Sequence, residues 1–247
     1  DRWILALHDA PPSILSTLPR VKERIAKVRE VRLKSDSKPT KALAATPTLY
    51  HINVIPTAPF LVVPRVSSEK REYAPIGWLN PPTVPSDAVT ILLNATKPVF
   101  ALLTSTMHMT WLRYIGGRLG NGYRYSIGIV YNTFPLPLVS DSDLTKLELQ
   151  AEAVLNARAD HPKATLANLY DPDTMPSNLR KAHQAVDRAV DRLYRKSGFD
   201  SDRERVEHLL GLYEKMAMPL TAATKKKPAR RSTARRSTTA GSAGRSA

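Results

Sequence analysis

The residues best suited to chemistry lie in a short glycine-rich stretch, Gly116-Gly-Arg-Leu-Gly-Asn-Gly-Tyr-Arg124. Its two arginines and its asparagine each carry several hydrogen-bond donors. Glycine has no Cβ, so a loop rich in glycine can approach another backbone closely. The stretch therefore indicates a binding loop, because it offers donors without a nucleophile or a general base.

A second motif, Asn80-Pro-Pro-Thr83, resembles the Asn-Pro-Pro-aromatic signature of enzymes that methylate the amino group of adenine or cytosine. In those enzymes the aromatic side chain stacks on a flipped-out base. Thr83 cannot stack, and no glycine-rich strand-to-helix turn for the methyl donor precedes the motif. The surrounding prolines favour a loop, so we predict no methyltransferase site here.

Other catalytic patterns are also missing. Asp171 and Asp173 lie close together, but no second acidic cluster with a lysine completes a divalent-metal site. We expect these two aspartates to turn the chain and to cap the helix that begins near Pro176. His183 falls on an apolar helical face, where we expect a packed side chain rather than a ligand. The sequence therefore predicts neither catalytic nor metal-binding residues, and no cofactor in this chain.

The charge of the chain indicates a polyanionic partner. The formal net charge is +15, and the residues from Thr221 to Ala247 carry eight cations and no acid, which leaves +7 on the other 220 residues. Since both the body and the tail are basic, nucleic acid is the natural inference. The alternative is that the charge only keeps the chain soluble.

Composition narrows the class of protein further. No apolar run approaches the ~20 residues that span a bilayer, and no signal peptide opens the sequence, so we predict no membrane partner. The chain has no cysteine, which fits a reducing cytoplasm. It begins at Asp1 in the middle of an apolar run, so we expect a fragment of something longer.

The elements that must position the loop fall into an α+β pattern with a mixed sheet. The first segment, to about residue 39, ends in a cationic helix with an apolar face, which is either a solvated surface or a phosphate-facing one. Apolar runs at residues 49–52, 60–63, 91–93 and 99–103 predict strands, with polar loops at 65–71 and 81–87. A helix that begins after Ser105 and contains a core Trp111 precedes the glycine-rich stretch, and residues 123–131 alternate as a strand.

The last third of the chain predicts a small helical bundle. Helices are expected after a Ser140-x-x-Asp143 cap, after Pro176, and after a Ser201-x-x-Glu204 capping box. We therefore predict a recognition domain at residues 1–137, a helical domain at 138–220 and a disordered basic tail at 221–247.

Phrases along nearly the whole chain resemble the C-terminal third of the MmeI-like (type IIL) DNA methyltransferases, which are single-chain restriction–modification enzymes. They include Val63-Pro-Arg-Val-Ser-Ser-Glu-Lys-Arg-Glu-Tyr73, Thr104-Ser-Thr-Met-His-Met109, Ile129-Val-Tyr-Asn-Thr-Phe-Pro135, Arg180-Lys-Ala-His-Gln-Ala185 and Asp187-Arg-Ala-Val-Asp-Arg-Leu-Tyr194. In that family this region is the target recognition domain followed by a C-terminal helical segment. An upstream domain transfers a methyl group from S-adenosylmethionine to adenine N6. Only the basic tail lies outside the resemblance.

The resemblance implies that loops of this chain enter the major groove of double-stranded DNA and contact base edges. Arginine suits guanine and asparagine suits adenine, through paired hydrogen bonds. The candidates, which are equally suited to phosphate contacts or surface salt bridges, are Arg65, Lys70 and Arg71 in the first loop, Ser86 and Asp87 in the second, and Arg118, Asn121 and Arg124 in the third.

Three functions remain open at this point. The leading one is sequence-specific DNA recognition as a fragment of an adenine-N6 methyltransferase, inactive alone and partnered by a methyltransferase domain fused upstream. The second is a specificity subunit that serves a separate methyltransferase in trans. The third is a basic protein that binds nucleic acid without sequence preference, mainly through its tail.

Overall fold

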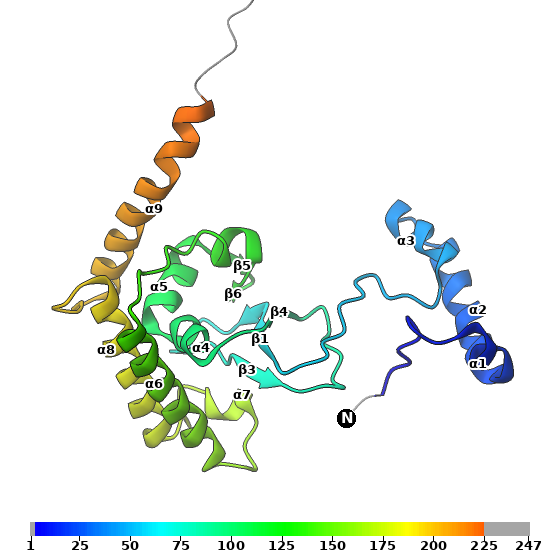
Figure 1. Ribbon diagram of the computed structural model, residues 1–247, viewed down its shortest axis with the longest axis horizontal. Coiled ribbons are helices and arrows are strands. Elements are labelled where there is room, and N and C mark those ends of the chain that lie inside the picture. The colour runs from blue at the N-terminus through cyan, green and yellow to red at the C-terminus, as the bar shows by residue number, and fades with distance from the viewer. Residues whose placement is uncertain (1–2, 225–247) are drawn as a thin grey trace, which may run out of the picture. The chain divides into compact units, whose positions relative to one another are not determined.

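The computed structural model describes residues 3–224 and has an α+β fold, as predicted (Figure 1). The chain forms two compact units, one made of Asp1–Val63 and Ile76–Ala95, the other of Pro64–Pro75 and Thr96–Ala247. A short segment after the first strand thus leaves the first unit and belongs to the second. No helix within residues 3–224 is long and apolar enough to cross a membrane.

The first unit begins with helices α1 (Pro12–Thr17), α2 (Pro19–Leu33) and α3 (Lys38–Ala42) and a short 3₁₀ turn, η1 (Leu43–Ala45). The predicted cationic helix is α2, and one of its cations is used internally. Arg32 donates to the carbonyls of Leu43, Thr46 and Leu49, at 2.9, 3.0 and 2.7 Å. Arg32 therefore holds the following loop in place, and it is not available on the basic face of α2 for a phosphate.

The strand predicted at residues 49–52 is wrong. The carbonyl of Leu49 accepts from Arg32, and the amide of Tyr50 donates to the Asn53 side chain at 2.8 Å. Both backbone groups that a neighbouring strand would need are thus already paired. The segment forms a turn instead.

A three-stranded sheet follows, in the order β3 (Gly77–Leu79), β1 (Phe60–Pro64), β4 (Val89–Leu93). Strands β1 and β3 are antiparallel, with Phe60 opposite Leu79 and Val62 opposite Gly77. The residues of β1 up to Val63 are buried, so the apolar run at 60–63 is a core strand, as predicted.

The second unit opens with two helices, α4 (Lys97–Thr104) and α5 (Thr106–Ile115). The strand predicted at 99–103 is wrong, because these residues form α4. Pro98 stands in its first turn, where the proline ring favours a helix start. The run is apolar on every face, so its periodicity does not separate a buried strand from a buried helix.

Ser105 caps α5 as predicted, and its hydroxyl accepts from the His108 amide at 3.3 Å. Trp111 lies in the core as predicted. A second sheet has the order β2 (Val66–Ser67), β6 (Gly122–Arg124), β5 (Gly117–Leu119), with antiparallel pairing throughout.

The strand predicted at 123–131 is only partly right. It ends at Arg124, and a π-helical turn, η2 (Ile127–Tyr131), follows. The Ser126 hydroxyl accepts from the Ile129 amide at 3.3 Å, and the Ser126 carbonyl accepts from the Val130 amide at 2.9 Å. Serine at this position diverts the backbone into a turn before the alternation can continue as a strand.

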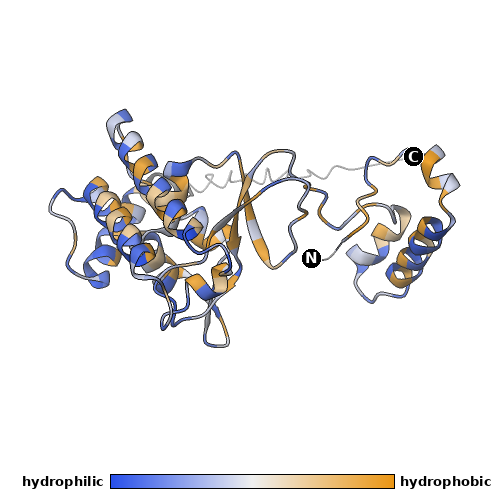
Figure 2. Ribbon diagram, turned by 90° about the horizontal axis from the view of Figure 1, so that it is seen from below, coloured by the Kyte–Doolittle hydropathy of each residue, from blue (hydrophilic) through white to orange (hydrophobic). Residues whose placement is uncertain are grey.

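The helical bundle consists of α6 (Asp141–Ala159), α7 (Leu166–Leu169), α8 (Ser177–Tyr194) and α9 (Asp202–Thr224). Helix α6 packs on α4 and α8, and α5 packs on α9 (Figure 1). Figure 2 shows apolar and polar residues along these helices, and their buried positions include Leu147, Val154, Val186 and Val190.

The predicted helix caps are confirmed in part. Ser140 and Asp143 form a full capping box, and the Glu204 amide donates to Ser201 at 3.2 Å. Helix α8, however, has no side-chain cap, so the capping role expected of Asp171 and Asp173 is wrong. The Asp171 side chain accepts from the Asp173 amide at 3.0 Å, which forms the predicted turn. Helix α9 continues to Thr224, and the rest of the predicted tail lies outside the described residues.

Candidate nucleic-acid interface

The first and third predicted loops meet in one sheet. The residue after Arg65, Val66, lies opposite Arg124 in the β2–β6 pair. The Arg65 carbonyl accepts from the Tyr125 amide at 2.8 Å, which extends the pairing by one residue. Two candidate arginines, 59 positions apart by their numbers in the sequence, therefore share one hydrogen-bonded backbone ladder. Both side chains are exposed.

Arg118 has a defined place on the β5–β6 hairpin, opposite Tyr123. Its guanidinium carbon lies 4.0 Å from the centre of the Tyr123 ring. One guanidinium nitrogen is 3.9 Å from a carboxylate oxygen of Glu69. A cation–π contact and a long, exposed ion pair orient the side chain but leave 47% of it accessible. The group is thus presented on the surface rather than folded into the core.

Asn121 lies at the tip of the hairpin and is exposed. The turn depends on Gly120, whose φ of +57° is a left-handed conformation that favours glycine. We refer to residues 117–124 as the recognition hairpin and to residues 64–75 as the recognition segment.

Lys70 and Arg71 differ within the recognition segment. Lys70 is exposed, while Arg71 is half-buried and its Nε atom is buried with no hydrogen-bond partner among the described residues. An unpaired buried donor is costly, so Arg71 has an unsatisfied group that an added acceptor would complete. Glu69 directly precedes these two cations in the sequence and pairs with Arg118, so it links the recognition segment to the recognition hairpin.

Ser86 and Asp87 belong to the first unit, immediately before β4. The Ser86 hydroxyl accepts from the Ala88 amide at 3.3 Å, and the Ser86 carbonyl accepts from the Val89 amide at 3.4 Å. Both residues are exposed. The structure therefore brings six of the eight candidates onto one sheet and its loops, and places these two in a separate turn.

The recognition segment is held by Asp187 of α8, which sequence reasoning did not single out for this role. Its carboxylate accepts from the Tyr73 hydroxyl at 2.7 Å, and from the amide and hydroxyl of Thr106 at 2.6 and 2.9 Å. Tyr73 belongs to the recognition segment. Thr106 is the first residue of α5, the helix that leads to the recognition hairpin. One side chain thus fixes both candidate elements to the bundle.

Two arginines reinforce this attachment. Arg113 donates to Asp202 at 2.7 Å and to the Glu72 carbonyl at 3.1 Å, and Arg180 pairs with the Glu72 carboxylate. Asp187 and Asp191 are four residues apart and therefore share one face of the helix, beside an apolar stripe. This spacing is the one signal in the sequence that both acids face inward.

Two histidines of the second unit, His108 on α5 and His183 on α8, are buried as neutral groups. His108 Nε2 lies 3.0 Å from the Tyr125 hydroxyl, and burial lowers its pKa to about 3. His183 stacks on Tyr73 with ring centroids 4.2 Å apart, and burial followed by the charge of Arg158 lowers its pKa to about 3. The prediction that His183 is a packed residue is therefore confirmed.

The Asn80–Thr83 motif forms a surface turn, and no metal-ligand cluster occurs in the described part of the chain. In the Asn80–Thr83 motif the Thr83 amide donates to the Asn80 carbonyl at 3.0 Å, which closes a turn, and both residues are exposed. No group of three or more histidine or acidic side chains within residues 3–224 is arranged to hold a metal ion.

The junction between α5 and the recognition hairpin leads to a first prediction. A Cβ added at Gly116 would lie 2.5 Å from the Leu112 carbonyl oxygen and 2.8 Å from Leu112 Cδ1. We expect Gly116→Ala to destabilise the protein by about 1–3 kcal/mol, the usual cost of overpacking. Urea denaturation measures this, with Gly128→Ala as the control, because a Cβ at Gly128 meets nothing within 4 Å. Equal stability of the two variants would contradict the prediction.

A basic hairpin and a basic segment joined in one small sheet, and anchored to a helical bundle, define a scaffold that presents loops for binding. Comparisons with known proteins agree with this class. The family model described as the MmeI target recognition domain matches residues 1–138, and the model of the MmeI C-terminal domain matches residues 139–221. The chain therefore belongs to the MmeI family and comprises these two domains.

Two relatives extend the comparison. The chain is 40% identical over 215 residues to DNA methyltransferase A of Bacillus subtilis (strain 168), which covers 87% of this chain and 24% of that protein. It is 42% identical to a solved structure of the type IIL restriction–modification enzyme MmeI in complex with DNA, with a TM-score of 0.84, covering 87% of this chain and 29% of that one. The chain thus spans about a quarter of the length of these relatives.

Proposed function

We propose that this chain reads DNA sequence as the target-recognition part of a restriction–modification methyltransferase that acts on adenine N6. The observation that carries the proposal is the β2–β6 pairing, which joins the recognition segment and the recognition hairpin into one exposed surface. That surface presents arginines and an asparagine, the side chains suited to guanine and adenine edges. The family relationship supports the same role, because one relative was solved in complex with DNA.

The methyl donor, S-adenosylmethionine, does not fit the described residues. The clustered glycines form the turn of the recognition hairpin and do not form a strand-to-helix turn that would cradle the donor. We therefore assign donor binding and catalysis to a methyltransferase domain, fused upstream or supplied in trans. In this division of labour the present chain selects the site and supplies no group to the transfer step.

The test is selection of bound duplexes from random double-stranded DNA with the 247-residue chain at physiological salt. We expect an enriched motif of several base pairs. If the folded protein binds DNA but enriches no motif, sequence reading by this chain is wrong and the tail-driven alternative gains. The salt concentration must be stated with every affinity, because phosphate contacts make binding strongly salt-dependent.

A second prediction concerns Arg118. We expect Arg118→Ala to relax the preference at one position of the selected motif, with a loss of about 1–3 kcal/mol of discrimination there. The stability of the variant should change little, because the ion pair with Glu69 is long and exposed. The measurement is a repeat of the selection, with the exposed loop variant Lys163→Ala as the control. An unchanged motif at wild-type affinity would remove Arg118 from base reading.

A further inference from the structure

Helix α8 contains a repeated Asp-Arg pair, Asp187-Arg188 and Asp191-Arg192. Residues four apart on a helix lie on the same face, one turn above each other. The two aspartates therefore share one face, and the two arginines share the neighbouring one. The repeat gives the helix an acidic side and a basic side, each two residues long.

The acidic side is fully used inside the protein. Asp187 accepts from Tyr73 and Thr106, as described above. Asp191 is 5% exposed and accepts two hydrogen bonds from the Arg205 guanidinium, at 3.1 and 2.7 Å. Neither aspartate is thus left to neutralise the arginine that follows it in the sequence.

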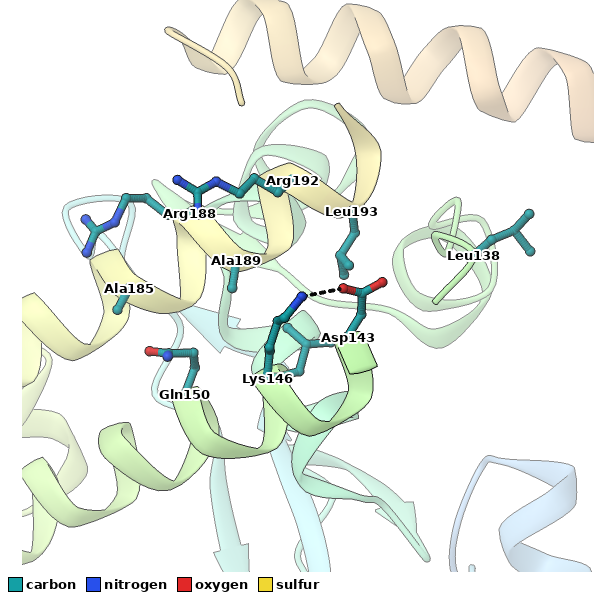
Figure 3. A pocket seen from close by; sticks show the side chains of 10 residues that line it. Leu138, Asp143, Lys146, Gln150, Ala185, Arg188, Ala189, Arg192 and Leu193 are labelled. Carbon is teal, nitrogen blue, oxygen red and sulfur yellow. Dashed lines mark hydrogen bonds and ion pairs between the residues drawn. The ribbon is translucent and has the colours of Figure 1, made fainter. Parts of the chain in front are cut away.

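The basic side borders a groove between α6 and α8, which we call the bundle groove (Figure 3). The groove has a volume of about 440 Å³, and Arg188 and Arg192 line it from α8. Figure 3 shows Lys146 and Gln150 on α6 facing the small side chains Ala185 and Ala189 on α8. The alanines leave room between the helices for a group the size of a phosphate.

The charge of the bundle groove is positive. The side chains of Arg188 and Arg192 are exposed and have no hydrogen-bond or ion-pair partner in the described part of the chain. Lys146 pairs with Asp143, the only acid among the described residues that line the groove, at 3.4 Å. Three cations against one carboxylate leave a charge of +2, which an anion would compensate.

We propose that the bundle groove binds backbone phosphates of duplex DNA through Arg188 and Arg192. The proposal rests on the proposed function, since it supplies the sequence-independent contacts that accompany base reading. Arginine forms paired hydrogen bonds with phosphate oxygens in a fixed geometry. The residues lining the groove include no aromatic side chain, so it lacks the anchor typical of a protein–protein hot spot.

The same helix then serves both kinds of contact. Its aspartate side positions the recognition segment and α5, while its arginine side binds the phosphates of the DNA backbone. Phosphate contacts fix the register and orientation of a protein on the duplex, and base contacts supply the specificity. Because both sides belong to one rigid helix, the phosphate contacts determine where the recognition hairpin lies along the bases.

The test compares the 247-residue chain with its double variant Arg188→Gln/Arg192→Gln, on a fixed duplex containing the selected motif and on a scrambled duplex. We expect weaker binding to both duplexes by the same factor. The slope of log affinity against log salt should fall by about 1.8, since each phosphate contact contributes ~0.9. The charge reversal Arg188→Glu/Arg192→Glu should weaken binding further.

The control removes two exposed cations elsewhere in the helical domain, Lys163→Gln/Arg203→Gln, and should retain the wild-type slope if the effect belongs to the groove. An unchanged slope in the groove variant would overturn the proposal. Failure of the proposed function is distinguishable, because the selection then enriches no motif and the salt slope is measured on the scrambled duplex alone. The groove variant still reports a reduced slope in that case if the inference is right.

Discussion

Replacing Asp187 with alanine is expected to lower the free energy of unfolding by about 3 kcal/mol, through three donors left without their acceptor. The Tyr73 hydroxyl, the Thr106 amide and the Thr106 hydroxyl all depend on this carboxylate. Tyr73 is only 1% exposed, so water cannot readily replace the lost partner. We expect the recognition segment to lose its fixed position as well, because Tyr73 ties it to α8.

Urea denaturation followed by circular dichroism measures this effect, since the second unit contains α4 to α9. Asp187→Asn should lose less than Asp187→Ala, because an amide oxygen still accepts a hydrogen bond. The control is Asp173→Ala, an exposed aspartate in the turn before α8. A double-mutant cycle with Tyr73→Phe should show coupling of about 0.5–3 kcal/mol between the two side chains. An Asp187→Ala variant as stable as the control would show that the contact contributes nothing.

Acid is expected to unfold the second unit through its two buried histidines. His108 and His183 have pKa values of about 3 in the folded state, against about 6.5 in the unfolded chain. Between these values the unfolded state binds more protons, so stability falls as the pH falls. Each histidine contributes a slope of about 1.4 kcal/mol per pH unit, or about 2.7 for the pair.

Protonation of His183 is opposed by its surroundings. Arg158 donates to the Tyr170 hydroxyl at 2.9 Å, so that hydroxyl donates to His183 Nε2, 2.6 Å away. A proton on that nitrogen would break the hydrogen bond and place a second positive charge beside Arg158. Burial raises the pKa of Asp187. Above the ordinary pKa of an aspartate the folded state therefore binds more protons at this group, so Asp187 makes stability rise as the pH falls, opposite to the histidines.

Stability measured in urea at several pH values between 4 and 7 tests this expectation. We expect His183→Phe to halve the slope, because one of the two buried histidines is gone, while the exposed His51→Gln keeps it. A loss of about 5 kcal/mol over two pH units is comparable to the whole stability of a typical domain, so the wild type should unfold between about pH 4 and 5. A wild-type slope in His183→Phe would mean that His183 does not titrate on unfolding.

Local signals in the sequence predict the elements whose cause is local. Ser105 and the pair Ser140 and Asp143 cap helices where the pattern places them, because capping involves residues three apart. The apolar run at 99–103 does not reveal α4, because it is buried on all sides and lacks a distinguishing period. The strand predicted at 49–52 is absent for another reason. Arg32 of helix α2 donates to the Leu49 carbonyl, which is then not free to pair with a neighbouring strand.

Part of the candidate site is likewise predictable from the sequence, and part of it is not. The composition of the recognition hairpin predicts an exposed basic loop, and the structure places Arg118, Asn121 and Arg124 on the surface. Nothing in the sequence reveals that this hairpin pairs with the recognition segment, or that Asp187 joins partners 114 and 81 residues away. Such contacts arise from tertiary packing, which no local pattern contains. Whether these side chains read bases remains a prediction.

The pairing of β2 with β6 also bears on how such a protein acquires a new target. The recognition segment and the recognition hairpin are separated by residues 76–116, yet Val66 faces Arg124 in one ladder. A crossover between two related genes within that interval would join a segment from one parent to a hairpin from the other. The two strands would then have to match in register and in side chains before any base is read. We therefore expect these two stretches to be inherited together, and a transplanted specificity to require both.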